Sequence, residues 1–242
     1  FANLHDTMMD VMKRAKAEYG EKYHVCGGDG VHPSANGQLV MAYVFLKARG
    51  FDGDLGTITV DLAGKAAATG GHTVLSSDGG KVELESTRYP FCLFGDDKSP
   101  NSQRSILPFL PFNQDLNRMV LVVKGLQADK AKVTWGQTEK TFARADLEKG
   151  VNLAAEFLDN PFADAFRNVD RAVAAKQNYE TWLIKEFNRT ARGIEHQVKG
   201  DAEVEAAVKT LRARLLAKHD ALAKAVRDAF VPVTHTITVL PE

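Results

Sequence analysis

The chain has 242 residues, of which 44% are hydrophobic, so it can form one or two domains with a substantial buried core. Its 31 Lys and Arg residues equal its 31 Asp and Glu residues, so no net field favours nucleic acid or an anionic membrane as a partner. No run approaches the roughly 18–20 apolar residues that a membrane-spanning helix needs. Composition therefore predicts a globular protein with no membrane span and no nucleic-acid partner.

The first part of the chain contains two predicted amphipathic helices that frame a loop. Residues 1–4 are typical of the end of a strand, and Asp6 suits the N-cap of a helix that ends at Gly20. A second helix is predicted over residues 35–47, with Ser34 as its cap. Each helix should bury one face, because apolar residues recur at helical spacing. These are Met8, Met12, Ala15 and Tyr19 in the first helix, and Leu39, Ala42, Tyr43 and Leu46 in the second.

The loop between these helices places a carboxylate three residues before an imidazole, at Asp29 and His32. Gly30 permits a positive φ angle between them, and Pro33 stiffens the exit into the second helix. A carboxylate that accepts the Nδ1–H of a histidine fixes the tautomer of the ring and leaves Nε2 free to take a proton from a hydroxyl nucleophile. We therefore expect Asp29 and His32 to be catalytic, as a buried acid and a general base.

The residues around this pair resemble one block of a known enzyme family. Gly28–Gly37 reads Gly-Asp-Gly-Val-His-Pro-Ser-Ala-Asn-Gly, and an apolar helix begins at Gln38–Ala42. This stretch is similar to the D-x-x-H-P block of the SGNH (GDSL-type) hydrolases, which supplies their catalytic Asp and His. The resemblance covers roughly residues 1–50. It implies that this part is the C-terminal end of a flavodoxin-like three-layer α/β/α domain, and that the whole protein is an esterase.

The rest of that family's machinery has no counterpart here. The sequence contains no Gly-Asp-Ser motif for the nucleophile and no Gly-x-Asn-Asp motif for the oxyanion, and Gly95-Asp96-Asp97 lacks the serine. We therefore expect the chain to be the C-terminal part of a serine ester hydrolase, inactive alone. Its apolar helix faces should bind the missing N-terminal half or self-associate. The resemblance implies a carbohydrate ester or another small acyl ester as substrate, no cofactor, and a secreted or periplasmic protein.

From residue 51 the sequence changes to β structure, and we expect a second domain over residues 51–242. The irregular stretch 87–117, rich in Phe and Pro, is too long for a simple connection. It is either functional, as a lid or substrate rim, or it contains unrecognised elements. Alternating and β-branched runs predict strands at residues 57–62, 72–75, 81–85, 118–123, 131–135 and 139–142.

Two long helices with strong periodicity are predicted over about residues 161–198 and 201–229. Gly200-Asp201 suits a tight reversal, so the pair should form an antiparallel helical hairpin over about residues 161–230. After Pro232, residues 234–239 alternate as a closing strand. We expect this strand to rejoin the sheet that begins at Thr57, which makes the hairpin an insertion in the β domain.

A rival interpretation belongs to a different class of protein. In it, Asp29 and His32 only tie their turn together, and the chain is a non-catalytic β-domain module whose hairpin docks to a partner or a polysaccharide. Core packing is the simpler use of Trp135, Trp182 and the Phe-rich residues 89–112, although a sugar-binding platform is the alternative.

The remaining candidate ligands are few. His24 and Cys26 offer at most two ligands, and no other histidines have the spacing of a metal site, so no metal is predicted. Cys26 and Cys92 leave a disulfide open, because two cysteines do not make a framework.

Overall fold

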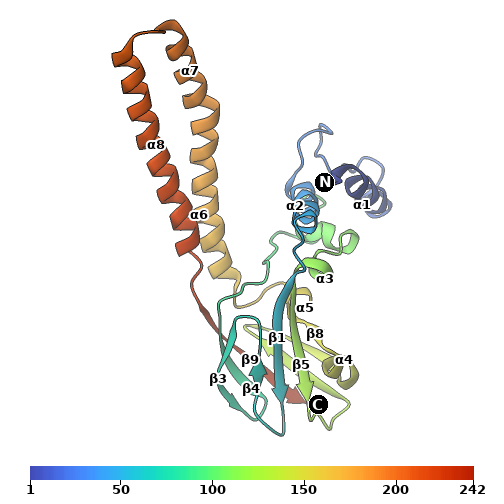
Figure 1. Cartoon of the computed structure of the whole chain (residues 1–242). Coiled ribbons are helices and arrows are strands. Elements are labelled where there is room, and N and C mark those ends of the chain that lie inside the picture. The colour runs from blue at the N-terminus through green and yellow to red at the C-terminus, as the bar shows by residue number, and fades with distance from the viewer. The chain divides into compact units, whose positions relative to one another are not determined.

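The computed structural model describes residues 1–242 and divides into two compact units. The first unit contains residues 1–162 and 233–242, and the second contains residues 163–232. Figure 1 labels the elements of both units. The fold is mixed α/β with two sheets, which confirms the expected class in its coarse form. The domain boundary predicted near residue 50 lies inside the first unit and stays a prediction.

A four-stranded sheet of the first unit has the order β2-β1-β5-β8. Its centre is a parallel pair, β1 (Asp54–Asp61) and β5 (Arg118–Lys124). The short strands β2 (Ala67–Ala68) and β8 (Val151–Asn152) pair antiparallel with the two outer edges. Alternate residues of β1 and β5 are buried, as expected for a sheet with one face in the core. These are Ile58, Val60, Met119, Leu121 and Val123.

The second sheet is antiparallel and has the order β3-β4-β9-β6-β7. Its strands are β3 (His72–Asp78), β4 (Lys81–Ser86), β6 (Lys130–Trp135), β7 (Thr138–Ala143) and β9 (Val233–Pro241). All six predicted strands before the hairpin are therefore present. The helices α4 (Arg144–Lys149) and α5 (Leu153–Glu156) follow β7 and β8 and pack on β5.

The closing strand corrects one expectation. We predicted that it rejoins the sheet that begins at Thr57, but β9 lies between β4 and β6 in the other sheet. Both edges of β1 are already taken by β2 and β5. In contrast, Ile237 of β9 pairs with Val82 of β4 on one side and with Trp135 of β6 on the other. All three side chains are buried, so β9 has apolar neighbours on both sides in this sheet. The hairpin is still an insertion between strands of the first unit.

The two opening helices are α1 (Leu4–Tyr19) and α2 (Ala35–Ala48). The predicted strand end at residues 1–4 is wrong, because helix α1 already begins at Leu4. Its N-cap is Asn3 rather than Asp6: the Asn3 side chain accepts the backbone N–H of Asp6 at 3.2 Å. Ser34 does occupy the cap position of α2, although its side chain makes no capping hydrogen bond.

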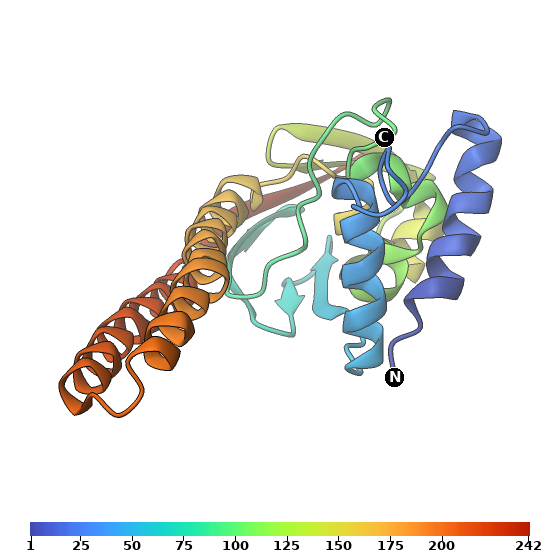
Figure 2. The ribbon, with the colours of Figure 1, turned by 90° about the horizontal axis from the view of Figure 1, so that it is seen from above.

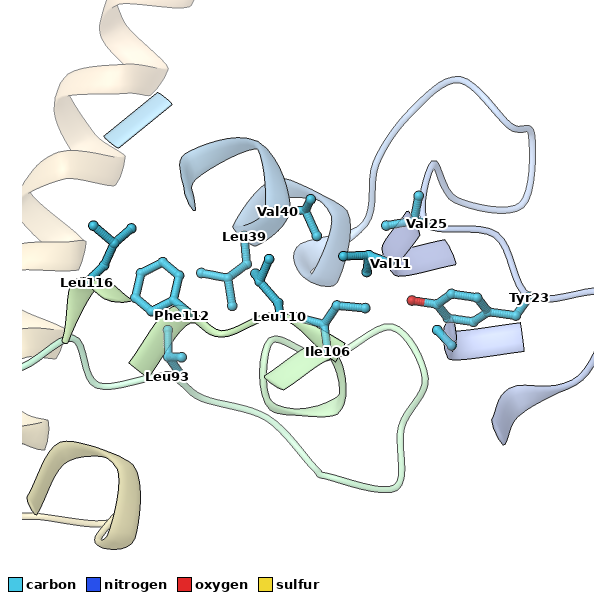
Figure 3. Packing of buried hydrophobic residues seen from close by; sticks show 11 residues of the cluster. Val11, Tyr23, Val25, Leu39, Val40, Leu93, Ile106, Leu110, Phe112 and Leu116 are labelled. Carbon is cyan, nitrogen blue, oxygen red and sulfur yellow. The ribbon is translucent and has the colours of Figure 1, made fainter. Parts of the chain in front are cut away.

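Residues 93–116 cover the buried faces of both helices. This segment contains the 3₁₀ helix η1 (Arg104–Phe109) and the short helix α3 (Phe112–Leu116), and Figure 2 shows it, in green, against α1 and α2. The apolar faces that we expected to be unpartnered are thus largely filled by this chain, although Met9 and Phe45 stay exposed. Figure 3 shows the shared core: Val11, Ala15, Tyr23, Val25, Leu39, Val40, Leu93, Ile106, Leu110, Phe112 and Leu116.

The second unit is the predicted antiparallel hairpin. Its first arm is α6 (Ala163–Trp182), a π-helical turn η2 (Leu183–Phe187) and α7 (Asn188–Gln197); its second arm is α8 (Ala202–Asp228). The Asp201 side chain caps α8 by accepting two backbone N–H groups. Polar contacts join the arms, among them the Arg212–Glu195 ion pair at 3.0 Å. No helix of the chain is both long and apolar enough to cross a membrane.

Candidate acid–base site

The Asp29 loop, residues 20–34 between α1 and α2, is held by two close backbone approaches. A Cβ on Gly27 would lie 2.3 Å from the His32 carbonyl oxygen, and a Cβ on Gly37 would lie 2.1 Å from the Val25 carbonyl oxygen. Gly27 also has a φ angle of 70°. Glycine is therefore required at both positions, and the loop is pressed onto the first turn of α2.

The buried side chain of Asn36 fastens this loop to a distant turn. Its Nδ2 donates to the Tyr23 hydroxyl at 2.7 Å and to the Pro100 carbonyl at 3.0 Å. Its backbone N–H donates to the Asn101 carbonyl at 3.3 Å. The start of α2, the loop and residues 100–101 consequently form one connected framework around the predicted site.

Asp29 and His32 meet as predicted. One carboxylate oxygen of Asp29, Oδ1, accepts the backbone N–H groups of Val31 and His32, each at 2.9 Å. The other, Oδ2, lies 2.6 Å from Nδ1 of His32. The hydrogen bond from the His32 ring, followed by the backbone N–H groups, lowers the pKa of Asp29 to about 2. The acid is therefore ionised over the whole physiological range.

This geometry fixes the chemistry available to the imidazole. Because the ionised carboxylate can only accept, a neutral His32 ring carries its proton on Nδ1 and presents a lone pair at Nε2. Nε2 has no hydrogen-bond partner within the chain. The His32 side chain is 84% exposed and that of Asp29 is 55% exposed. The expectation of a buried acid is therefore wrong, because residues 28–32 of this loop are all exposed.

A second exposed histidine–aspartate contact in α1 provides a useful comparison. Nδ1 of His5 lies 2.9 Å from Asp6 Oδ1, and both side chains are more than three-quarters exposed. However, the Asp6 carboxylate accepts only side-chain donors, those of His5 and Asn3, and no backbone N–H. The Asp29 pair differs in being built into a constrained loop, which is the arrangement that a reaction needs.

The loop carries a second imidazole with the opposite proton placement. The Cys26 backbone N–H donates to Nδ1 of His24 at 3.2 Å, so a neutral His24 ring carries its proton on Nε2. Cys26 is not joined to Cys92 by a disulfide. No group of three His, Cys, Asp or Glu side chains gathers in a way that could hold a metal ion.

The structure also assembles a buried polar chain that the sequence analysis missed. Trp135 Nε1–H donates to Nδ1 of His235 at 3.1 Å, and Nε2 of His235 lies 2.8 Å from Ser86 Oγ. Ser86 Oγ lies 2.7 Å from Nδ1 of His72, whose Nε2 lies 2.7 Å from the Leu55 carbonyl. Each donor meets one acceptor only if both histidines are neutral.

This serine–histidine contact is structural. Ser86 is completely buried, and both histidines are at most 6% exposed, so no substrate reaches the hydroxyl. The four side chains come from β3, β4, β6 and β9, far apart in the sequence. No local sequence motif indicates this network, because its four residues come together only when these strands pair.

No protein-family model matches the chain, and no curated protein matches it. A solved structure described as a gut microbial diltiazem-metabolizing enzyme does superpose on it, with a TM-score of 0.66 and 21% sequence identity. The match covers 98% of this chain and 61% of that chain. The fold is one that a known enzyme uses. Our chain spans about three fifths of the length of that enzyme.

Proposed function

We propose that residues 1–242 form the C-terminal part of a serine ester hydrolase of the SGNH type, in which Asp29 and His32 are the acid and the base of the triad. One observation carries this proposal. The ionised Asp29 carboxylate holds Nδ1–H of His32 at 2.6 Å, and the lone pair of Nε2 is left open to solvent. The pair also lies in the stretch that resembles the D-x-x-H-P block, between two helices.

In the proposed reaction, Nε2 of His32 takes the proton of a serine hydroxyl as the serine oxygen bonds to the ester carbonyl carbon. Asp29 stabilises the imidazolium that forms, through the hydrogen bond to Nδ1. Nε2 then gives this proton to the leaving alkoxide as the ester C–O bond breaks, which leaves an acyl-enzyme. In the second half, His32 deprotonates a water molecule that attacks the acyl carbon. The bond from the acyl carbon to the serine oxygen then breaks, the proton passes from His32 to the serine oxygen, and the carboxylic acid leaves.

The serine and the oxyanion donors are proposed to come from outside residues 1–242. The sequence supports this because it contains neither a Gly-Asp-Ser nor a Gly-x-Asn-Asp motif. The greater length of the diltiazem-metabolizing enzyme, of which 61% is matched, agrees with an additional segment. We further propose that α1 and α2 close a flavodoxin-like three-layer α/β/α domain completed by that segment. Its substrates are small acyl or carbohydrate esters.

Kinetics of the full-length protein that contains these residues test the proposal. With 4-nitrophenyl acetate as substrate, His32→Ala should lower kcat by about 10⁴- to 10⁶-fold, because it removes the proposed acceptor of the serine proton. Asp29→Asn should lower kcat by about 10⁴-fold, since an amide no longer enforces the Nδ1–H tautomer.

The exposed pair in α1 supplies matched controls. His5→Ala and Asp6→Asn remove the same kinds of side chain from a similar contact outside the loop, and each should leave kcat within about twofold of wild type. The proposal is wrong if His32→Ala reduces kcat no more than His5→Ala does. That result would favour the interpretation of the chain as a non-catalytic module.

A further inference from the structure

A hollow of about 310 Å³ lies beside the Asp29 loop. Its lining comes from three segments: Tyr19 at the end of α1, residues 22–28 of the loop itself, and residues 100–101. Gly27 belongs to this lining and also lies directly against the His32 carbonyl group. The hollow is therefore next to the pair that we propose to be catalytic, and the Asn36 framework holds its walls in place.

His24 offers a fixed hydrogen-bond donor at this hollow. Its Nδ1 accepts the Cys26 N–H, so its remaining ring proton sits on Nε2. The ring lies against Gly30 of the same loop, since a Cβ on Gly30 would be 3.7 Å from its Cε1 and 3.8 Å from its Nε2. No residue of the chain accepts the Nε2–H. His24 therefore complements His32: one ring presents a donor and the other an acceptor.

The charge of the lining is positive. Lys22 is the only ionised side chain among the lining residues, and none of them is acidic. Its ammonium group forms no ion pair within the chain. Both carboxylates of the loop have other partners: Glu21 pairs with Lys16 at 3.6 Å, and Asp29 accepts from three N–H donors. An oxygen-rich anion would satisfy both the Lys22 ammonium and the His24 Nε2–H.

We propose that this hollow is a substrate-binding site for a carboxylate group, held by Lys22 and His24. Resting on the proposed function, the preferred substrates are esters whose non-reacting part carries a carboxylate. Tyr19 and Tyr23, whose ring centroids are 5.3 Å apart, form the aromatic part of the lining and pack against the carbon chain of such a substrate.

A comparison of two esters of equal chain length tests the selectivity in the full-length protein. The ratio of kcat/KM for 4-nitrophenyl hydrogen succinate to that for 4-nitrophenyl butyrate should fall about five- to tenfold in Lys22→Ala and in His24→Ala, through KM and not kcat. Lys22→Arg and His24→Gln keep the charge and the Nε2–H donor, so both should retain the ratio. Lys13→Ala, an exposed lysine of α1 outside the hollow, is the control and should not change it.

Binding of succinate, measured independently of turnover, separates this inference from the proposed function. In protein labelled with ¹⁵N-histidine, succinate should shift the His24 ring resonances, and Lys22→Ala should abolish the shift. If succinate shifts His24 but no ester is hydrolysed, the binding site stands and the proposed hydrolase fails. If esters are hydrolysed with the same selectivity in wild type, Lys22→Ala and His24→Ala, and succinate shifts nothing, the inference is overturned while the hydrolase stands.

Discussion

Asp29 and His235 have pKa values shifted by opposite kinds of environment. Asp29 is exposed, and hydrogen bonds from the His32 ring and two backbone N–H groups lower its pKa to about 2. His235 is buried between strands, and loss of solvation lowers its pKa to about 4. The first shift keeps a charge available to a reaction at the surface. The second keeps a ring neutral inside a sheet, where the Trp135 N–H occupies its only free nitrogen lone pair.

The buried histidines predict a loss of stability in acid. An unfolded histidine titrates near 6.5, whereas folded His235 titrates at about 4, so between these values only the unfolded state takes up the proton. Stability is therefore fully present above pH 6.5 and lost as pH falls towards 4. His235 contributes about 3 kcal/mol to this loss between pH 7.5 and pH 4. Burial lowers the pKa of His72 too, which acts in the same direction.

Urea unfolding at the two pH values measures this effect. In a Trp182→Phe background the fluorescence of Trp135 reports the first unit alone, because the chain has two tryptophans. His235→Gln should make the acid-induced loss smaller by about 3 kcal/mol. The exposed His196→Gln in α7 should leave it unchanged. An equal pH dependence in wild type and His235→Gln would contradict the account of the buried network.

At the residue scale, local pattern predicted the proposed base but not its surroundings. Asp29 and His32 are three residues apart, so loop chemistry alone brings them together. The hollow needs residues 100–101, which Asn36 attaches to the loop. Sequence patterns carry no information about such a contact, since 64 residues separate Asn36 from Pro100.

Among the elements, α2 shows how a helix can be adapted to carry a site. Gly37 lies in its first turn, where alanine would normally stabilise a helix by about 1 kcal/mol. At this position, however, a Cβ would lie 2.1 Å from the Val25 carbonyl oxygen and 2.9 Å from Pro33 Cβ. We expect Gly37→Ala to destabilise the protein by about 1–3 kcal/mol, because the loop backbone must shift. Urea unfolding followed by circular dichroism measures the change.

A helical glycine with free space around it provides the control. Apart from the nearby backbone of its own helix, no atom lies within 4 Å of a Cβ placed on Gly193 of α7, so Gly193→Ala should stabilise the hairpin by up to about 1 kcal/mol. A similar stabilisation by Gly37→Ala would show that the loop is not pressed onto α2 as described.

Element types were predictable wherever periodicity is regular, as in the hairpin and in the longer strands of both sheets. The two-residue strands β2 and β8 were not predicted. The helices within residues 87–117 could not be predicted. They are short and are stabilised by the core that they fill, and Pro108 and Pro111 interrupt any helical pattern in the sequence. The partners of β9 were also missed. Its alternation indicates a strand, but the choice of sheet depends on which edges are free.

In the whole molecule, we propose that residues 1–242 supply the acid and the base of the site and that another segment supplies its nucleophile. The 242-residue chain alone should release no burst of nitrophenol from 4-nitrophenyl acetate, because it contains neither the nucleophile motif nor the oxyanion motif. Its rate should equal that of the same chain carrying His32→Ala. Stopped-flow absorbance measures this, and a stoichiometric burst that His32→Ala abolishes would show that a serine of residues 1–242 is the nucleophile.

Mass spectrometry of the full-length protein after reaction with a fluorophosphonate tests the central claim most directly. The reagent forms a covalent bond to an activated serine oxygen, so the modified peptide identifies the nucleophile. We predict that the modified serine lies outside residues 1–242, and that His32→Ala slows the modification by at least a thousandfold while His5→Ala does not. A modified serine within residues 1–242, or an unchanged rate in His32→Ala, would contradict the account.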